Sequence, residues 1–64
     1  MKVNDEIIIT ATFDDLTYIP EYNRKEILKN PVGIIKYIGK EIVEVRSCLG
    51  IWWFDKKFIK LKEN

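Results

Sequence analysis

The chain has no histidine and a single cysteine, Cys48, among its 64 residues. A lone cysteine cannot close an internal disulfide, and without histidine the usual zinc ligand sets are unavailable, so we expect no metal site. Histidine is also the commonest general base, and neither a glycine-rich phosphate loop nor a serine nucleophile motif is present. We therefore predict no enzyme and no cofactor, with Cys48 packed as a small hydrophobe. The catalytic alternatives are a pair of carboxylates from distant strands and an oligomeric barrel enzyme.

Long apolar runs are missing as well. No stretch approaches the 18 residues of a membrane-spanning helix, and residues 1–6 are too polar and too acidic for a signal peptide. We expect a cytoplasmic protein with no membrane partner. The composition, 33% charged and 47% hydrophobic, is that of a folded globule, and the length suffices for one domain, residues 1–64. A domain of this size has a net stability of about 3–10 kcal/mol.

Two prolines and three glycines are the main interruptions, and between them the apolar residues mostly alternate with a period of two. Such alternation is typical of a strand with one buried face. It predicts five short strands, over residues 6–13, 32–38, 42–49, 51–54 and 59–62. The reversal at Gly39 and Lys40 predicts a hairpin between the second and third strands. The expected core includes Ile7, Ile9, Phe13, Val43, Val45 and Leu61.

Residues 14–30 form a long polar segment that does not follow this alternation. Pro20 favours one or two helical turns that end before Pro31, because proline suits the first position of a helix, although the apolar spacing is irregular. We predict a long first loop that contains these turns, and loops of such length in small domains are usually functional or disordered. An open sheet would leave both edges unshielded, so the predicted fold is an all-β, five-stranded barrel.

The C-terminal run from Phe54 to Leu61 resembles the end segment of SH3-like small barrels, in which an apolar residue enters a 3₁₀ turn and an aromatic residue starts the last strand. Residues 11–15 resemble the first-strand exit of SH3 domains, and residues 33–45 are similar to the KOW type of barrel. The resemblance implies a five-stranded SH3-like barrel with a long first loop and a 3₁₀ turn before the last strand. It does not extend to proline-rich peptide binding, because Asp15 and Asp55 stand where SH3 domains have an aromatic residue and a proline.

Trp52 and Trp53 are adjacent in the fourth strand, so their side chains point to opposite faces. An inward Phe54 assigns Trp52 to the core and leaves Trp53 on the outer face with Ile51. Such an exposed pair fits a partner anchor, because tryptophan is enriched at binding hot spots. The alternative is that Trp53 lies under the long loop. For Tyr18 and Tyr22, in that loop, the two interpretations are again contact with a partner or packing of the loop onto the barrel.

Basic residues gather in the second half of the chain. From Gly33 onward seven basic side chains stand against four acidic ones, whereas the first 32 residues have four basic and six acidic. Basic side chains beside exposed aromatics hold single-stranded nucleic acid in many proteins, although solvated lysines on an outer strand are the simpler interpretation. The nucleic-acid candidates are Lys36, Lys40, Arg46, Lys56, Lys57 and Lys60.

These observations favour a non-enzymatic interaction module that binds a protein partner through the long loop and the outer aromatic face. The predicted contact residues are Tyr18, Tyr22, Ile51 and Trp53. The alternative is a KOW-like nucleic-acid or ribosome-associated binding protein that uses the basic half. Eleven isoleucines and nine lysines with no glutamine suggest a gene from an A+T-rich bacterium or its phage. We therefore expect a phage or mobile-element product that inhibits or regulates a host protein.

Overall fold

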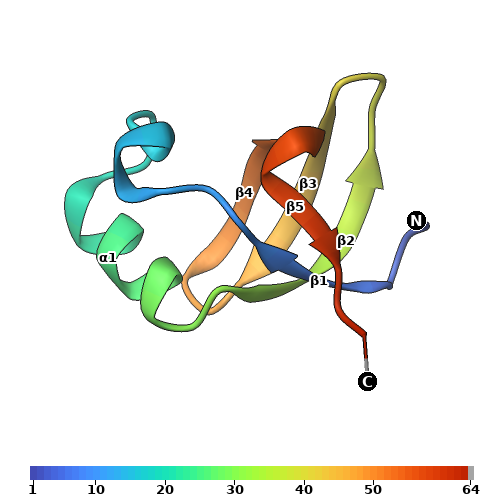
Figure 1. Ribbon diagram of the computed structural model, residues 1–64, viewed down its shortest axis with the longest axis horizontal. Helices are drawn as coiled ribbons and strands as arrows, with labels where there is room; N and C mark the ends of the chain where they lie inside the picture. The colour runs from blue at the N-terminus through green and yellow to red at the C-terminus, as the bar shows by residue number, and fades with distance from the viewer. Residues whose placement is uncertain (64) are drawn as a thin grey trace.

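The computed structural model describes residues 1–63 and contains five strands, one α-helix and two 3₁₀ turns. In chain order these are β1 (Glu6–Ile9), η1 (Phe13–Leu16), α1 (Glu21–Lys29), β2 (Val32–Ile38), β3 (Ile42–Ser47), β4 (Gly50–Asp55), η2 (Lys56–Phe58) and β5 (Ile59–Leu61). The five strands form one antiparallel sheet in the order β4-β3-β2-β1-β5 (Figure 1). The predictions of five strands, of the β2–β3 hairpin and of a 3₁₀ turn before the last strand are confirmed.

The sheet is open, because no ladder joins β4 to β5 within residues 1–63. It is strongly curved all the same. Figure 1 shows β1 and β5 crossing in front of β3 and β4, and side chains from all four strands share one core. Backbone hydrogen bonds therefore do not close the described strands into a barrel, and the sheet keeps the two edges that the predicted closure would have removed.

The core lies on the concave side of the sheet. Its buried members are Ile7, Ile9, Ala11, Leu16, Ile19, Ile27, Ile35, Val43, Val45, Phe54 and Ile59. The alternation identified the inward residues of β1 and β3 correctly, and Phe54 faces inward as expected. Trp52 packs half-buried against this core. Its indole Nε1 is buried and has no hydrogen-bond acceptor among the residues described.

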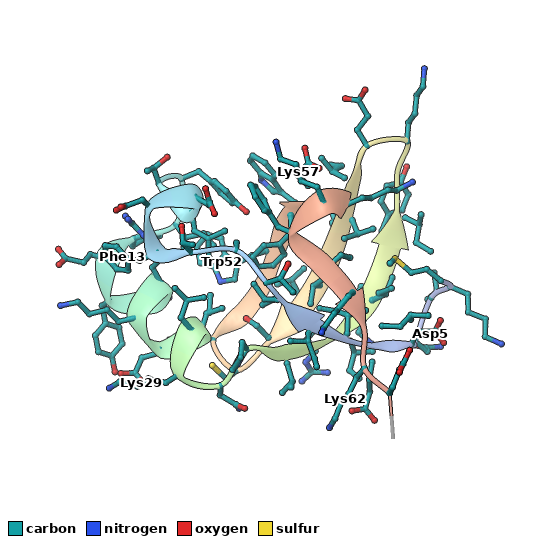
Figure 2. The ribbon with its side chains drawn as sticks, in the orientation of Figure 1. Asp5, Phe13, Lys29, Trp52, Lys57 and Lys62 are labelled. Carbon is teal, nitrogen blue, oxygen red and sulfur yellow. The ribbon has the colours of Figure 1, made fainter. Side chains whose placement is uncertain are left out.

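Two residues predicted for the core lie outside it, Phe13 and Leu61. Strand β1 ends at Ile9, and the chain then turns into η1, where the Phe13 ring packs under the Arg24 guanidinium at 4.3 Å instead of entering the core. Figure 2 shows Phe13 on the side of the molecule occupied by α1. Leu61 is the last residue of the short edge strand β5 and is 43% exposed. The alternation was extended too far at Phe13, whereas Leu61 pairs with the buried Ile7 as the alternation requires and is exposed because it lies at the end of an edge strand.

The turn between β3 and β4 corrects a third expectation. Cys48 and Leu49 form a two-residue turn between the paired Ser47 and Gly50, and both side chains are exposed. Gly50 has a φ of 109°, a conformation that side chains disfavour, and so suits the end of this turn. Cys48 therefore does not pack as a small hydrophobe. Its Sγ lies 3.7 Å from the carbonyl oxygen of Glu26 at the surface.

The segment between β1 and β2 is more ordered than the sequence pattern indicates. The predicted one or two helical turns are a helix of nine residues, Glu21–Lys29, in which Pro20 is the N-cap rather than the first helical residue. Leu16, Ile19 and Ile27 from this segment are completely or almost completely buried in the core. Arg24 holds the segment together, since its Nε and Nη1 donate to the carbonyls of Ile19 and Phe13, each at 3.2 Å. The long loop is thus part of the hydrophobic core.

Candidate binding surface on the outer face of the sheet

A β-bulge in β2 decides which of its side chains reach the convex side of the sheet. Ile35 pairs with Val45 and Tyr37 pairs with Glu44, so Lys36 is an extra residue in the ladder. As a result Lys36 and Tyr37 are both exposed although they are adjacent in sequence. Bulges re-aim side chains and are frequent beside functional sites. This one places a cation and an aromatic ring together on the convex side.

Cross-strand pairing brings the outward residues of β3 and β4 next to the bulge. Arg46 lies between Ile51 of β4 and Ile34 of β2, and Glu44 lies between Trp53 and Tyr37. Directly opposite residues have Cβ atoms about 4.5–5.5 Å apart, so these side chains are neighbours. We call this surface the outer face. It consists of Ile34, Lys36, Tyr37, Ile42, Glu44, Arg46, Ile51 and Trp53.

The outer face leaves large apolar side chains uncovered. Ile51 is 57% exposed, Tyr37 55%, Trp53 48% and Ile42 39%. Together they are four of the ten large apolar side chains that are exposed among residues 1–63. Apolar surface gathered in one place and edged by charges is typical of interaction sites on soluble proteins. The outer face is therefore the candidate binding surface of this protein.

Trp53 is held from one side by Tyr18. The two rings stack with centroids 4.1 Å apart and planes inclined by 10°, and the Tyr18 hydroxyl donates to the carbonyl of Trp53. The hydrogen bond from Lys56 N to Glu41 O shows that these two residues form a hydrogen-bonded pair. Hydrogen-bonded and non-hydrogen-bonded pairs alternate along an antiparallel ladder, so Glu44 and Trp53, three positions further on, form a non-hydrogen-bonded pair. The Trp53 carbonyl therefore points to the free edge of β4, and Tyr18 covers part of this edge. Burial raises the pKa of Tyr18 to about 12.

The predicted contact residues are only partly brought together. Ile51 and Trp53 share the outer face, and Tyr18 joins them by stacking, so Trp53 is both outward and in contact with the loop. Tyr22 lies on α1, 69% exposed and apart from the stack of Tyr18 and Trp53. Tyr37 was missed by the sequence reasoning. If the two-residue period continued from Ile35, Tyr37 would face inward. No signal in a single sequence reveals the bulge that exposes it.

The predicted basic residues are spread over several elements. Lys36 and Arg46 are on the outer face, Lys40 is in the β2–β3 hairpin, Lys56 and Lys57 are in η2, and Lys60 is on β5. Figure 2 shows Lys57 at the opposite end of the molecule from Lys62, which follows β5. A nucleic-acid backbone would therefore meet separate cations rather than one continuous basic stripe.

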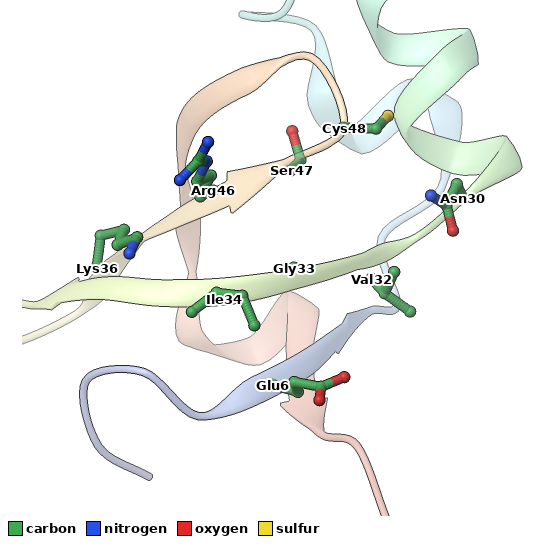
Figure 3. A pocket seen from close by; sticks show the side chains of 9 residues that line it. All are labelled: Glu6, Asn30, Val32, Gly33, Ile34, Lys36, Arg46, Ser47 and Cys48. Atoms are coloured by element: carbon green, nitrogen blue, oxygen red, sulfur yellow. The ribbon is translucent and has the colours of Figure 1, made fainter.

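An open pocket of about 340 Å³ adjoins the apolar part of the outer face (Figure 3). It is lined by the cations Lys36 and Arg46, by the apolar side chains of Val32 and Ile34, and by Gly33, Glu6, Asn30, Ser47 and Cys48. Gly33 matters for the backbone here. A Cβ on it would lie 2.8 Å from the carbonyl oxygen of Arg46 and closer still to Val45 Cγ1, so only glycine lets β2 and β3 approach this closely.

Within residues 1–63, no helix combines the length and apolar character needed to cross a membrane. The same residues contain no group of three or more cysteine and carboxylate side chains that could hold a metal ion. Comparisons with protein-family models, with curated proteins and with solved structures found no match for this chain.

Proposed function

We propose that this protein is a non-enzymatic interaction module that binds a segment of a partner protein on the outer face of β2, β3 and β4. The observation that carries the proposal is the exposure of Trp53, Ile51 and Tyr37 beside Arg46 and Glu44 on one side of the sheet. Tryptophan, tyrosine and arginine are the residue types most enriched at the energetic centres of protein interfaces. A partner that covers these side chains removes apolar area from water without any chemical step.

We further propose that the fold is an SH3-like barrel, of which the curved antiparallel sheet is the main part. The order of the five strands, the long connection after β1 and the 3₁₀ turn before β5 all support this assignment. In such a barrel the short β3–β4 turn and the Tyr18 stack hold Ile51 and Trp53 in place before a partner arrives. Rigid aromatic side chains lose little conformational entropy on binding, which favours affinity.

Nucleic-acid binding is the second candidate, and the neighbourhood of Lys36 and Arg46 to the exposed Tyr37 supports it. The local charge favours a protein partner instead. Glu44 stands between Trp53 and Tyr37, so a phosphate stacked near either ring would meet a carboxylate of the same charge. A protein segment needs no high density of positive charge, and the mixed charges of the outer face suit it better.

A module that binds without chemistry changes its partner by occupying a surface. The biological role that we propose is therefore regulation or inhibition of a host protein by a phage or mobile-element product. The composition of the chain, with eleven isoleucines and nine lysines, supports such a source.

The proposal is tested by selecting binders for the wild-type protein from a display library of random 12-residue peptides. Peptides selected in this way should bind the Ile51→Ser variant about 30-fold more weakly, because about 2 kcal/mol is a typical loss at an apolar anchor. Leu61→Ser is the matched control. Leu61 is 43% exposed but lies on β5, at the opposite edge of the sheet from β4, so its loss should leave affinity unchanged.

A parallel titration with a 12-nucleotide single-stranded DNA separates the two candidates. If no peptide is selected, and the oligonucleotide binds with an affinity that falls steeply between 50 and 200 mM salt, the protein is a nucleic-acid binder and the proposal is wrong. Equal weakening by Ile51→Ser and Leu61→Ser would also contradict it, because the outer face would then have no special part in binding.

A further inference from the structure

Two cations of the outer face, Lys36 and Arg46, line the pocket, and no ion pair within residues 1–63 includes either of them. The three ion pairs found within residues 1–63 join Lys25 to Glu21, Lys29 to Glu26 and Lys62 to Glu6. Neither Lys36 nor Arg46 takes part in any of them. Both side chains are exposed, so each is available to a ligand.

The one carboxylate that lines this pocket is engaged elsewhere. Glu6 Oε2 lies 3.3 Å from Lys62 Nζ, which follows the edge strand β5. Figure 3 shows Lys36 and Arg46 on neighbouring strands at one end of the pocket, with Glu6 across β2 and its carboxylate directed away from them. The end of the pocket beside Arg46 is therefore positively charged.

The positive end is also the end nearest the apolar anchor. Arg46 pairs directly with Ile51 on β4 and with Ile34 on β2, so its charge has an exposed isoleucine on one side and a pocket-lining isoleucine on the other. An anion bound here must carry an apolar part next to its charge. A free, fully hydrated inorganic anion has nothing to place against these two side chains.

From this arrangement we infer that the segment bound by the outer face carries an acidic residue, aspartate or glutamate, whose carboxylate is held by Arg46 and Lys36. The inference rests on the proposed function and names the chemistry of its partner. The guanidinium fork of arginine matches a carboxylate with two parallel hydrogen bonds, and lysine adds a second charge. The methylene stem of the acidic side chain covers Ile34, which lines the pocket directly opposite Arg46.

The spacing within the bound segment follows from the sheet. Arg46 and Ile51 are direct cross-strand neighbours, about 4.5–5.5 Å apart at Cβ. In an extended peptide, side chains on the same face recur every second residue, about 6.6 Å apart. The acidic residue should therefore lie two positions from the apolar or aromatic residue that contacts Ile51.

The experiment is a double-mutant cycle on a peptide selected with the wild-type protein. One side of the cycle is Arg46→Gln in the protein, and the other replaces the acidic residue of the peptide by its amide. Each single change should weaken binding about 10-fold, and the second change should then add no more than about twofold, because the two groups lose the same contact. Lys57→Gln is the control, since it removes the same charge from η2, outside the pocket.

Two further measurements complete the test. Repeating the selection with Arg46→Glu should replace the acidic residues of the selected peptides by lysine or arginine at the same spacing. Exchanging the acidic residue for phosphoserine distinguishes a carboxylate site from a phosphate site. Phosphoserine that binds more than 10-fold tighter would show that the pocket selects phosphate, and the inferred partner chemistry would be wrong.

Failure of the acidic-partner inference can be distinguished from failure of the interaction-module proposal. Peptides that bind, lose affinity with Ile51→Ser and yet show no acidic enrichment, or a cycle in which the two losses multiply, overturn the acidic partner and leave the interaction module intact. A library that yields no binder at all overturns both proposals. Wild-type-like unfolding of Arg46→Gln in urea, expected for an exposed side chain, excludes a folding defect as the cause of lost affinity.

Discussion

Replacing Ile27 by alanine tests whether α1 belongs to the cooperative fold. The Ile27 side chain is completely buried in the same core as the strands. The substitution removes three carbon groups, each worth about 0.8 kcal/mol of burial, which gives about 2.4 kcal/mol before the cavity is counted. Measured losses for such changes are about 2–5 kcal/mol, and the better helix propensity of alanine returns at most about 0.7 kcal/mol. The variant should therefore lose a large share of a total stability of about 3–10 kcal/mol.

Urea unfolding followed by tryptophan fluorescence measures this loss, because Trp52 packs against the core that Ile27 joins. Tyr22→Ala on the same helix is the control. Tyr22 is 69% exposed, and its replacement should change the free energy of unfolding by no more than about 0.5 kcal/mol. An Ile27→Ala protein that unfolds at the same urea concentration as the wild type would refute the reasoning and make α1 an appendage to the sheet.

Two further predictions concern the backbone at Gly33 and the contact of Tyr18. Gly33→Ala should destabilise the fold by about 1–3 kcal/mol in urea unfolding, because its Cβ would meet the carbonyl oxygen of Arg46 at 2.8 Å. An unchanged unfolding midpoint would mean that β2 and β3 can move apart freely. Burial raises the pKa of Tyr18 from 10.0 to about 12, so the folded protein keeps this proton at pH values where the unfolded chain has lost it. The stability that Tyr18 contributes relative to Tyr18→Phe is therefore present below pH 10 and should be lost as the pH rises to about 12. A stability difference that stays constant over this range would show that the Tyr18 hydroxyl is not buried by its contacts.

The strands could be predicted from the sequence because their signal is local. A two-residue period within four to seven residues is enough to define a buried face, and β2 occupies residues 32–38 as predicted. The opposite orientation of Trp52 and Trp53 needs only that they are neighbours in a strand. Where a strand ends is decided by contacts remote in sequence, and the alternation alone therefore extended β1 to Phe13.

The segment from η1 to α1 could not be predicted for a different reason. Of its core residues, Leu16 lies in η1, Ile19 in the connection that follows and Ile27 in α1, so they follow no single helical or strand period. What assembles them is Arg24, which joins the two elements by hydrogen bonds to two carbonyl oxygens. An arginine in a polar stretch gives no sign in the sequence that it has this role.

The candidate site shows the same division between local and remote causes. The alternation within a strand predicts the exposure of Ile51, Trp53 and Arg46, and Lys36 is among the predicted basic residues. The exposure of Tyr37 depends instead on the bulge in the register between β2 and β3, so this part of the outer face required the structure.

The contact between Tyr18 and Trp53 connects the stability of this small fold with its proposed function. An open sheet leaves the edge of β4 unpaired, and such edges attract other strands unless they are covered. The Tyr18 hydroxyl occupies one carbonyl of this edge, and the stacked ring fixes the indole of Trp53 against the loop. Because Tyr18 and Trp53 remain 36% and 48% exposed, the contact that protects the edge still leaves aromatic surface for a partner. An anchor oriented in advance costs less entropy to bind, so under the proposed function the same pair of rings would serve both purposes.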